Sequence, residues 1–472
     1  MKASDLFLRC LEAEGVEYIF GVPGEENADV MISLLDSPIR FIICRHEQGA
    51  AFMADLYGRM TGKPGVCLAT LGPGATNLLT GVANADMDCS PVVAITGQAS
   101  TTRLHKESHQ AMDVVGMFEP VTKWASMILQ PENIPEVVRK AFKLAVAEKP
   151  GATLVELPED IAKMEIDDTP IVPGMKVRRP VPDDKSIDAA LDLIAQARKP
   201  VLLVGNGCAR TRVTKQLNRF VDETGIYATM TFMAKGVVSD RHPQSLYAAG
   251  LGIKDHVMAV FEQADLVISV GYDMVEWHPS RWNPDGDKTI LHIDFTPAEV
   301  DGAYRPEVEC VGDIAACLWA INERLDDQHR KGDIAAFRKV RDRLTKELTE
   351  DHCTDDGFPM KPQRILHDIR LELRDHDVLI SDVGAHKMWT ARQYVTYEPN
   401  TCIISNGFCS MAIALPGSIG AKLACPERRV VGLQGDGGFM MNVQELATAV
   451  QYELPVVQVV WEDNEYGLIR WK

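Results

Sequence analysis

Short apolar runs alternate with polar or glycine-rich loops and with stretches of helical period along most of the chain. Near the start of the sequence, these runs end in loops such as GVPGE, RHEQG, GPGATN, GQAS and PED. This alternation predicts a doubly wound α/β domain, in which a parallel sheet carries helices on both faces. Its predicted strands are 18–22, 41–44, 66–71, 92–96 and 153–157.

The same alternation returns after a proline-rich linker at 167–184. We therefore predict three doubly wound α/β domains with parallel sheets, at 1–165, 185–325 and 360–472, which suits a chain of this length. A charged stretch at 326–350 predicts an exposed helix. The further predicted strands are 201–204, 266–270, 290–295, 378–381, 402–405, 430–433 and 456–461.

Residues 430–464 hold the most specific pattern in the chain. A strand runs into Gly435-Asp436-Gly437, a helix is predicted at 443–452, and a second strand ends at Asp463-Asn464. A crossover of this length places both strand ends at the carboxyl edge of a sheet, where open α/β sheets bind ligands. Two carboxylates beside glycine N–H groups suit Mg²⁺ and a diphosphate. Taken singly, GDG remains an ordinary turn and Asp-Asn an ordinary loop pair.

A second chemical signal lies in the first domain. Glu47 stands where the strand at 41–44 gives way to a predicted helix at 48–60. A carboxylate at the carboxyl end of a strand lies on the ligand-binding edge of the sheet. The alternative is a glutamate in the first turn of a helix, stabilised by the helix dipole.

Both segments resemble parts of thiamine-diphosphate enzymes. GDG followed by a metal ligand near the end of the next strand resembles their cofactor signature, and RHEQGAAFMADLYGR (45–59) resembles the segment that supplies the glutamate facing the aminopyrimidine ring. The resemblance implies pyrimidine-binding, central and diphosphate-binding domains, with Glu47 as the catalytic group. A carboxyl group whose pKa is raised by burial can promote the imino tautomer that takes the thiazolium proton. The cofactor itself is the electron sink.

The resemblance also implies the remaining site residues. Asp436, Asp463 and the backbone carbonyl of Glu465 would bind Mg²⁺, and the backbone at three glycines would approach the diphosphate: Gly435, Gly437 and Gly438. In the same family, the segments GPGATN (72–77), KESHQAMD (106–113) and SNGFCSMA (405–412) contact the cofactor or the substrate. The residues assigned on this basis are Pro73, Asn77 and Met411 for the cofactor, and His109 and Gln110 for the substrate.

Each of these segments has a plainer alternative. GPGATN also fits a tight strand-to-helix turn in which Thr76 or Asn77 caps the helix. His109 and Gln110 also fit an exposed polar loop, and Met411 alone would be a core residue.

Within this superfamily, the chain resembles acetolactate synthase large chains, particularly the catabolic, FAD-independent type. WED (461–463) matches a WND pattern there, which favours Asp463 over Asn464 as the second metal ligand. Biosynthetic synthases carry an arginine-containing FAD loop where this chain has Gly271-Tyr272-Asp273, and GNG (205–207) alone does not support FAD. The loop VPGEEN (22–27) differs from the usual synthase version and leaves the substrate preference open.

The family pattern also bears on the end of the chain and on its assembly. Family members usually continue well beyond the second metal ligand, so we expect the third domain to be incomplete; an uncovered site would favour protonation over carboligation. Glu47 and Asp436 fall in different domains. In this family, the cofactor lies between the first domain of one subunit and the last domain of its partner, which predicts a homodimer or homotetramer with the active site at the interface.

Composition and charge exclude several other classes. The formal net charge of −18 argues against binding to nucleic acid or to an anionic membrane. No apolar run approaches the length of a membrane span, and residues 1–20 lack a signal-peptide core. The eleven cysteines are scattered without CxxC spacing, as expected for reduced residues of a cytoplasmic protein.

The hypothesis is a transferase that depends on thiamine diphosphate and Mg²⁺, decarboxylates pyruvate and joins the product to a second 2-oxo acid, giving 2-acetolactate. Two alternatives stay open. One is a decarboxylase or lyase of the same superfamily that does not ligate, and the other is a non-catalytic protein that binds the cofactor.

Overall fold

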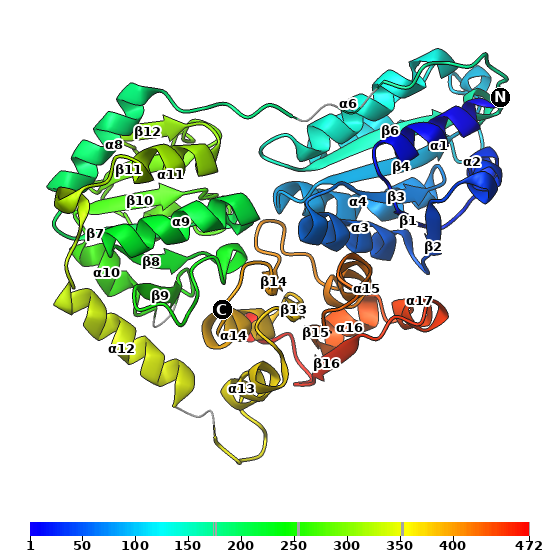
Figure 1. The fold of residues 1–472 in the computed structure, drawn as a ribbon. Coiled ribbons are helices and arrows are strands. Elements are labelled where there is room, and N and C mark those ends of the chain that lie inside the picture. Colours follow the sequence, from blue (N-terminus) through cyan, green and yellow to red (C-terminus); the bar gives the residue numbers. More distant parts are fainter. Residues whose placement is uncertain (173, 175–176, 253–254, 351–353, 472) are drawn as a thin grey trace. The chain divides into compact units, whose positions relative to one another are not determined.

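In the computed structural model (Figure 1), the chain forms two compact units. One unit holds Met1–Val177 together with Gly407–Lys472, and the other holds Arg178–Asn406. The residues that the structure describes are 1–172, 174, 177–252, 255–350 and 354–471.

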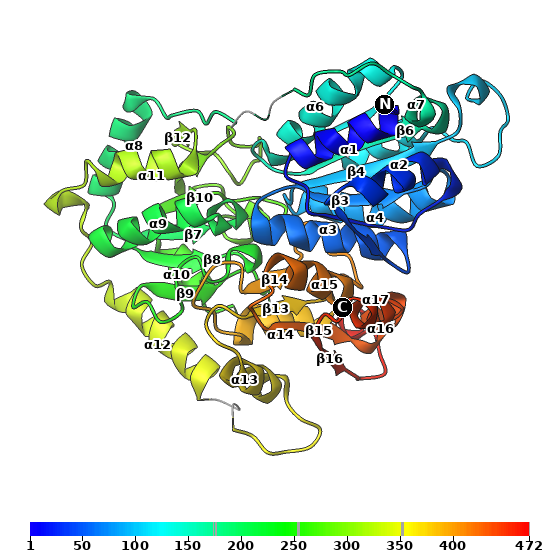
Figure 2. The same cartoon turned by 45° about the vertical axis from the view of Figure 1, so that its right-hand side comes forward.

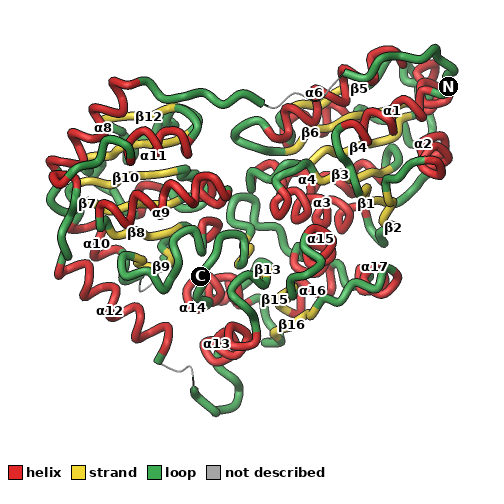
Figure 3. The backbone as a smooth tube through the Cα atoms, viewed as in Figure 1, coloured by secondary structure: helices red, strands yellow, loops and turns green. Residues whose placement is uncertain are grey.

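The first unit begins with a six-stranded parallel sheet in the order β2-β1-β3-β4-β6-β5. Helices α1 (Ala3–Ala13) and α6 (Ile134–Val146) pack on one face, and α3 (Glu47–Thr61) and α4 (Pro73–Met87) pack on the other. Figures 2 and 3 show these strands between the two layers of helices. The strands are β1 (Tyr18–Gly21), β2 (Arg40–Ile43), β3 (Gly65–Ala69), β4 (Val92–Gln98), β5 (Trp124–Met127) and β6 (Ala152–Pro158).

The doubly wound fold predicted for this region is therefore confirmed, and the predicted strands lie within two residues of the observed ones. Of the six strands in this sheet, only β5 was not predicted. It lies at the edge of the sheet, and all its residues are half-buried, so it lacks the continuous apolar run of the central strands.

The second unit holds another six-stranded parallel sheet, in the order β12-β11-β10-β7-β8-β9. Helices α8 (Asp184–Gln196), α9 (Thr211–Thr224) and α11 (Ile314–Asn322) cover one face, and α10 (Met258–Gln263) and α12 (Ala335–Thr349) cover the other. Three of its strands were not predicted: β8, β9 and β12. The strands are β7 (Pro200–Val204), β8 (Tyr227–Met230), β9 (Ser245–Ala248), β10 (Leu266–Val270), β11 (Thr289–Asp294) and β12 (Val308–Val311).

The helix predicted at 326–350 is present as α12, which begins only at Ala335. The prediction that it is exposed is wrong for one of its faces. Phe337, Leu344 and Leu348 are buried and belong to the core beneath the second sheet. Their spacing brings all three to one side of the helix, while most of the charged residues between them are exposed.

The third sheet is smaller, with four strands. In the second unit, β13 (Val378–Ser381) and β14 (Cys402–Ile404) form a parallel pair that is accompanied by α13 (Pro362–Glu372) and α14 (Ala385–Gln393). In the first unit, β15 (Val430–Gly435) and β16 (Val457–Trp461) form another parallel pair, with Gly435 opposite Trp461. This confirms the predicted crossover between residues 430 and 461.

The connection between β15 and β16 differs from the prediction. Helix α16 (Asp436–Met441) begins at Asp436, and α17 (Glu445–Gln451) follows after a break, whereas we expected one helix at 443–452. Gly437 and Gly438 therefore lie inside a short helix despite their low helical propensity, because tertiary contacts override that preference.

Helix α15 (Ala414–Ala424) packs directly on α3 within the first unit. A Cβ at Gly420 would lie 2.1 Å from the carbonyl oxygen of Met53, and one at Gly417 would lie 2.9 Å from Leu56. Gly420 is required because the backbones approach too closely for any side chain, and a side chain at Gly417 would displace that of Leu56.

The cysteines present in the described ranges are free, and most of them are buried. Cys353, which we expected to be reduced like the others, lies outside the described residues. None of the helices in the described ranges has both the length and the apolar character needed to cross a membrane.

Candidate active site

Glu47 is the first residue of α3, directly after the loop that leaves β2. Its N-cap residue, His46, accepts a hydrogen bond from the backbone N–H of Gln48 through Nδ1 at 3.1 Å. Only 9% of Glu47 is exposed, and the side chain of Asn77 on α4 donates to its Oε2 at 2.9 Å. A Cβ at Gly74 would lie 3.4 Å from the other carboxylate oxygen. Burial and the hydrogen bond from Asn77 therefore fix the carboxylate beside the GPGATN turn.

A second glutamate, Glu445 on α17, binds the backbone directly before Glu47. Its Oε1 accepts hydrogen bonds from the backbone N–H groups of Arg45 at 2.9 Å and of His46 at 3.0 Å. A Cβ at Gly49 would lie 2.7 Å from the same oxygen, so α3 has no room for a side chain there. Burial raises the pKa of Glu445, although the hydrogen bonds from Thr448 and from the backbone lower it. Sequence reasoning missed Glu445, because its partners lie about 400 residues away.

The predicted metal ligands lie where β15 and β16 end. Since Gly435 is opposite Trp461, Asp436 follows one strand directly and Asp463 lies in the loop after the other. Asp436 Oδ1 accepts from the N–H of Gly437 at 2.8 Å, and Asp463 Oδ1 accepts from the N–H of Glu465 at 3.2 Å. The carboxylate of Glu465 binds Arg470, whereas the predicted metal ligand is the backbone carbonyl of Glu465.

These residues fit a hard divalent cation by donor type, because two carboxylates and a carbonyl are the oxygen ligands that Mg²⁺ takes. Within the described ranges, there is no cluster of three or more His, Cys, Asp or Glu side chains arranged for a metal. The predicted set is of a different type, since one of its three ligands is a main-chain oxygen.

Met411 lies beside Gly437, as the cofactor assignment requires. A Cβ at Gly437 would lie 3.8 Å from Met411 Cε and 3.3 Å from the ring of Tyr466. The glycine thus leaves a narrow space that a side chain would fill, which fits the close approach of a ligand to the backbone. Tyr466 was not predicted, and as an exposed aromatic residue it gave no signal in the sequence.

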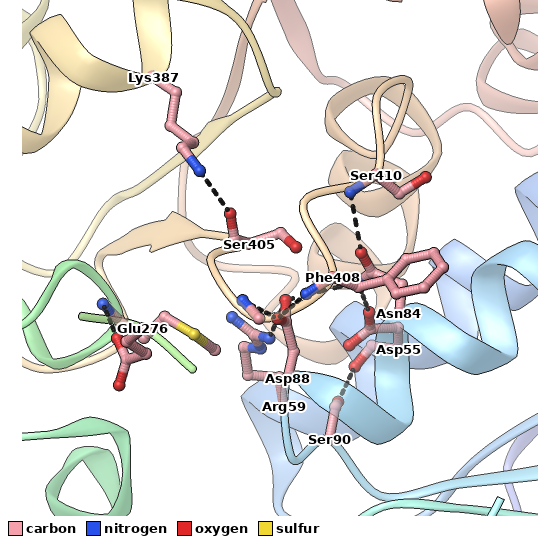
Figure 4. A network of polar contacts seen from close by, with 12 residues as sticks. Asp55, Arg59, Asn84, Asp88, Ser90, Glu276, Lys387, Ser405, Phe408 and Ser410 are labelled. Carbon is pink, nitrogen blue, oxygen red and sulfur yellow. Dashed lines mark hydrogen bonds and ion pairs between the residues drawn. The ribbon is translucent and has the colours of Figure 1, made fainter. Parts of the chain in front are cut away.

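The segment that carries Met411 includes residues with positive φ, and side chains of the first domain anchor its backbone. Cys409 and Ala412 have φ values of 61° and 75°, in the left-handed region. Asp88 Oδ1 accepts from the N–H groups of Gly407 at 2.8 Å and Phe408 at 3.4 Å (Figure 4). Asn84 Oδ1 accepts from the N–H of Ser410 at 3.4 Å.

These anchoring residues belong to a buried polar network on α3 and at the end of α4 (Figure 4). Arg59 forms an ion pair with Asp88 at 3.0 Å, and the two side chains are 11% and 0% exposed. Asn84 also donates to Asp55 at 2.9 Å, and burial raises the pKa of Asp55 while Arg59 lowers it. The positive φ values downstream can persist because this network fixes the segment.

The predicted substrate residues lie in an exposed loop between β4 and α5 (Val114–Phe118). Gln110 has a φ of 56°, and its backbone rests on the GPGATN turn: a Cβ at Gly72 would lie 2.8 Å from Gln110 O. The structure therefore brings Gln110 next to the turn that leads to Asn77. His109 is exposed beside it, and Pro73 is an exposed residue at the first position of α4.

In the second unit, the two glycine loops of the central sheet contact each other. Gly207 donates to the carbonyl oxygen of Gly271 at 2.9 Å, and a Cβ at Gly205 would lie 2.3 Å from that oxygen. The two loops follow β7 and β10, the neighbouring strands where the strand order reverses and where a dinucleotide would bind in such a sheet.

Comparison with protein families gives three matches along the chain. Residues 1–117 match the N-terminal TPP binding domain of thiamine pyrophosphate enzymes, residues 187–321 their central domain, and residues 382–472 their C-terminal TPP binding domain. The limits that we expected from the sequence, 1–165, 185–325 and 360–472, remain predictions.

Curated relatives match over nearly the whole chain. An acetolactate synthase of Bacillus subtilis is 36% identical over 100% of this chain and 83% of its own length. A catabolic acetolactate synthase of Raoultella terrigena is 36% identical over 99% of this chain and 84% of its own. A probable acetolactate synthase large subunit of Methanocaldococcus jannaschii is also 36% identical, over 100% of this chain and 82% of its own.

Proposed function

Since this chain belongs to the acetolactate synthase family of thiamine pyrophosphate enzymes, we propose that it decarboxylates pyruvate and joins the acetyl unit to a second 2-oxo acid, giving 2-acetolactate. The observation that supports this most directly is the placement of Glu47: a buried carboxylate at the carboxyl end of a strand, held by Asn77. When bound, thiamine diphosphate supplies the electron sink for decarboxylation.

Glu47 is the proposed catalytic residue. Its carboxyl group would hydrogen-bond to the aminopyrimidine ring of the cofactor and hold or release a proton there. Asn77 fixes the orientation of this carboxyl by donating to Oε2 at 2.9 Å. Glu445 fixes the backbone before Glu47 through two N–H groups. This chain thus supplies a positioned proton carrier in a partly water-excluded site.

Mg²⁺ would be held by Asp436, Asp463 and the carbonyl of Glu465, at the ends of two paired strands. The backbone of Gly435, Gly437 and Gly438 would approach the diphosphate. Gly438 is buried, while Gly435 and Gly437 are half-buried beside it.

Met411 would contact the cofactor through its apolar side chain, because it lies beside Gly437. His109 and Gln110 would contact the substrate, since they are exposed in a loop whose end rests on the GPGATN turn.

We propose a homodimer or homotetramer with the active site at the subunit interface, as the family pattern implies. We also propose a cytoplasmic location, which the free cysteines in the described ranges support. FAD is not part of the proposed cofactor set, because the chain has Gly271-Tyr272-Asp273 where biosynthetic synthases carry an arginine-containing FAD loop.

Glu47→Gln tests the proposed role of the glutamate. The amide keeps the size of the side chain and can still accept from Asn77, but it cannot exchange a proton. We expect pyruvate-dependent release of carbon dioxide to fall by about 10²–10⁴-fold, while calorimetry finds little change in the dissociation constant of thiamine diphosphate. Glu132→Gln, at an exposed glutamate on the same domain, is the matched control. Full activity of Glu47→Gln would refute the assignment.

A further inference from the structure

Three carboxylates lie within five residues where β6 gives way to α7 (Glu159–Lys163), in the sequence Glu156-Leu157-Pro158-Glu159-Asp160. The proposed chemistry uses none of them. Glu159 and Asp160 nevertheless accept hydrogen bonds from the loop that leaves β4 and carries His109 and Gln110, and Glu156 accepts one from Gln98, the residue directly before that loop.

Glu156 acts through Gln98, the last residue of β4. Glu156 is 0% exposed, and its Oε1 accepts from Gln98 Nε2 at 2.8 Å. The same Nε2 donates to the carbonyl oxygen of Met112 at 2.9 Å, and Gln98 Oε1 accepts from the N–H of Ala99 at 2.9 Å. One buried carboxamide therefore closes the loop at both ends, and Glu156 holds that carboxamide in place.

Glu159 and Asp160 bind the first turn of the loop. Asp160 accepts from the backbone N–H of Thr101 at 3.0 Å and from its hydroxyl at 2.5 Å. Glu159 accepts from the N–H of Ser100 at 3.2 Å and forms an ion pair with Arg103. The pKa of Asp160 is lowered, because the bonds from Thr101 outweigh the effect of burial. Asp160 is thus an anion bound to the loop at neutral pH.

The far side of the loop meets the GPGATN turn. Gln110 has a positive φ, and its carbonyl would lie 2.8 Å from a Cβ at Gly72. A residue keeps such a backbone conformation only when its surroundings fix it. The loop therefore has a base that is anchored by carboxylates and an end that presents exposed side chains beside the turn of Asn77.

We propose that Glu156, Glu159 and Asp160 are positioning residues that hold the loop of residues 99–112 so that His109 and Gln110 meet the substrate. This inference rests on the proposed function for the identity of the substrate, but the anchoring of the loop can be measured without turnover. The three carboxylates act through Gln98, Thr101 and Arg103, and none of them touches the reacting atoms.

The first test is limited trypsin digestion, because Arg103 and Lys106 are cleavage sites inside the loop. Asp160→Asn and Glu159→Gln lie at partly exposed positions and should leave the fold intact. Both variants keep an acceptor oxygen but lose the negative charge, and the difference between a charged and a neutral acceptor corresponds to about tenfold in an opening equilibrium, so we expect cleavage at these two sites to be about tenfold faster. Glu132→Gln, an exposed glutamate outside the loop contacts, is the control and should digest like the unmodified protein.

The second test is the kinetic pattern with pyruvate. We expect Asp160→Asn to raise KM for pyruvate about tenfold, to change kcat little and to leave the affinity for thiamine diphosphate unchanged. Glu156→Gln can still accept from Gln98, so its KM for pyruvate should stay close to that of the unmodified protein. Gln98→Ala removes the carboxamide that closes the loop, so its KM should rise.

The two tests distinguish anchoring of the loop from a role in substrate binding. Equal cleavage of Asp160→Asn and the control overturns the anchoring. Faster cleavage with an unchanged KM overturns the role in positioning and leaves only a structural contact. No turnover by the unmodified protein counts against the proposed function instead, and digestion then still decides whether the loop is anchored.

Discussion

Replacing Asp88 by Ala should release the segment that carries Met411. The substitution removes the acceptor for the N–H groups of Gly407 and Phe408 and leaves Arg59 without the carboxylate that it pairs with at 3.0 Å. Breaking a buried ion pair by removing one partner costs about 3–5 kcal/mol. The loss should lie toward the lower end, because Arg59 keeps 11% exposure and also interacts with Asp55.

Hydrogen exchange of the peptide that spans residues 405–413 measures this loss locally. Since each 1.4 kcal/mol corresponds to a factor of ten, we expect the amides of Gly407 and Phe408 to exchange about 10²-fold faster in Asp88→Ala. Asp88→Asn is the matched variant: its Oδ1 can still accept from Gly407, so the increase should be smaller. The dissociation constant of thiamine diphosphate should rise slightly in Asp88→Asn and more in Asp88→Ala, because Met411 moves with the released segment. Unchanged exchange in Asp88→Ala would refute the anchoring by Asp88.

Two other predictions concern the cofactor space and the dependence of stability on pH. Gly437→Ala places a methyl group 3.3 Å from the ring of Tyr466 and 3.8 Å from Met411 Cε; calorimetry should show thiamine diphosphate binding at least about tenfold more weakly, the cost of a small steric clash, and unaltered affinity would contradict the close backbone approach. Burial raises the pKa of Glu156 from 4.5 to about 8. Between these values the folded state holds a proton that the unfolded state has lost, so this group reduces stability as the pH rises from about 4.5 to 8. Glu156→Gln should therefore gain in Tm relative to the unmodified protein when the pH is raised from 5 to 8.5, and an equal difference at both values would exclude this titration.

The sequence predicted those parts of the site that depend on local order along the chain. The crossover between residues 430 and 461 was visible because two apolar strands flank a GDG turn, and the parallel pairing of Gly435 with Trp461 confirms it. Glu47 was placed at the start of a helix, and α3 begins there. In both cases, the change of period from strand to helix marks the edge of the sheet.

The rest of the site depends on contacts that no local pattern contains. Glu445 binds the backbone before Glu47 from about 400 residues away, and Asp88 binds Gly407 from 319 residues away. In the sequence, both look like ordinary acidic residues near the ends of helices. The start of α16 at Asp436 was missed for a related reason, because two glycines oppose a helix that only tertiary contacts stabilise.

The product formed from pyruvate distinguishes a carboligase from a decarboxylase and from a protein without activity. The protein would be supplied with thiamine diphosphate and Mg²⁺ but without FAD, and ¹³C-labelled pyruvate would be followed by NMR, with Glu47→Gln as the comparison. We expect acetolactate and carbon dioxide from the unmodified protein, and a rate lower by about 10²–10⁴-fold from the variant. Acetaldehyde as the sole organic product would contradict the carboligation, and no consumption of pyruvate by protein that binds the cofactor would contradict the proposed function.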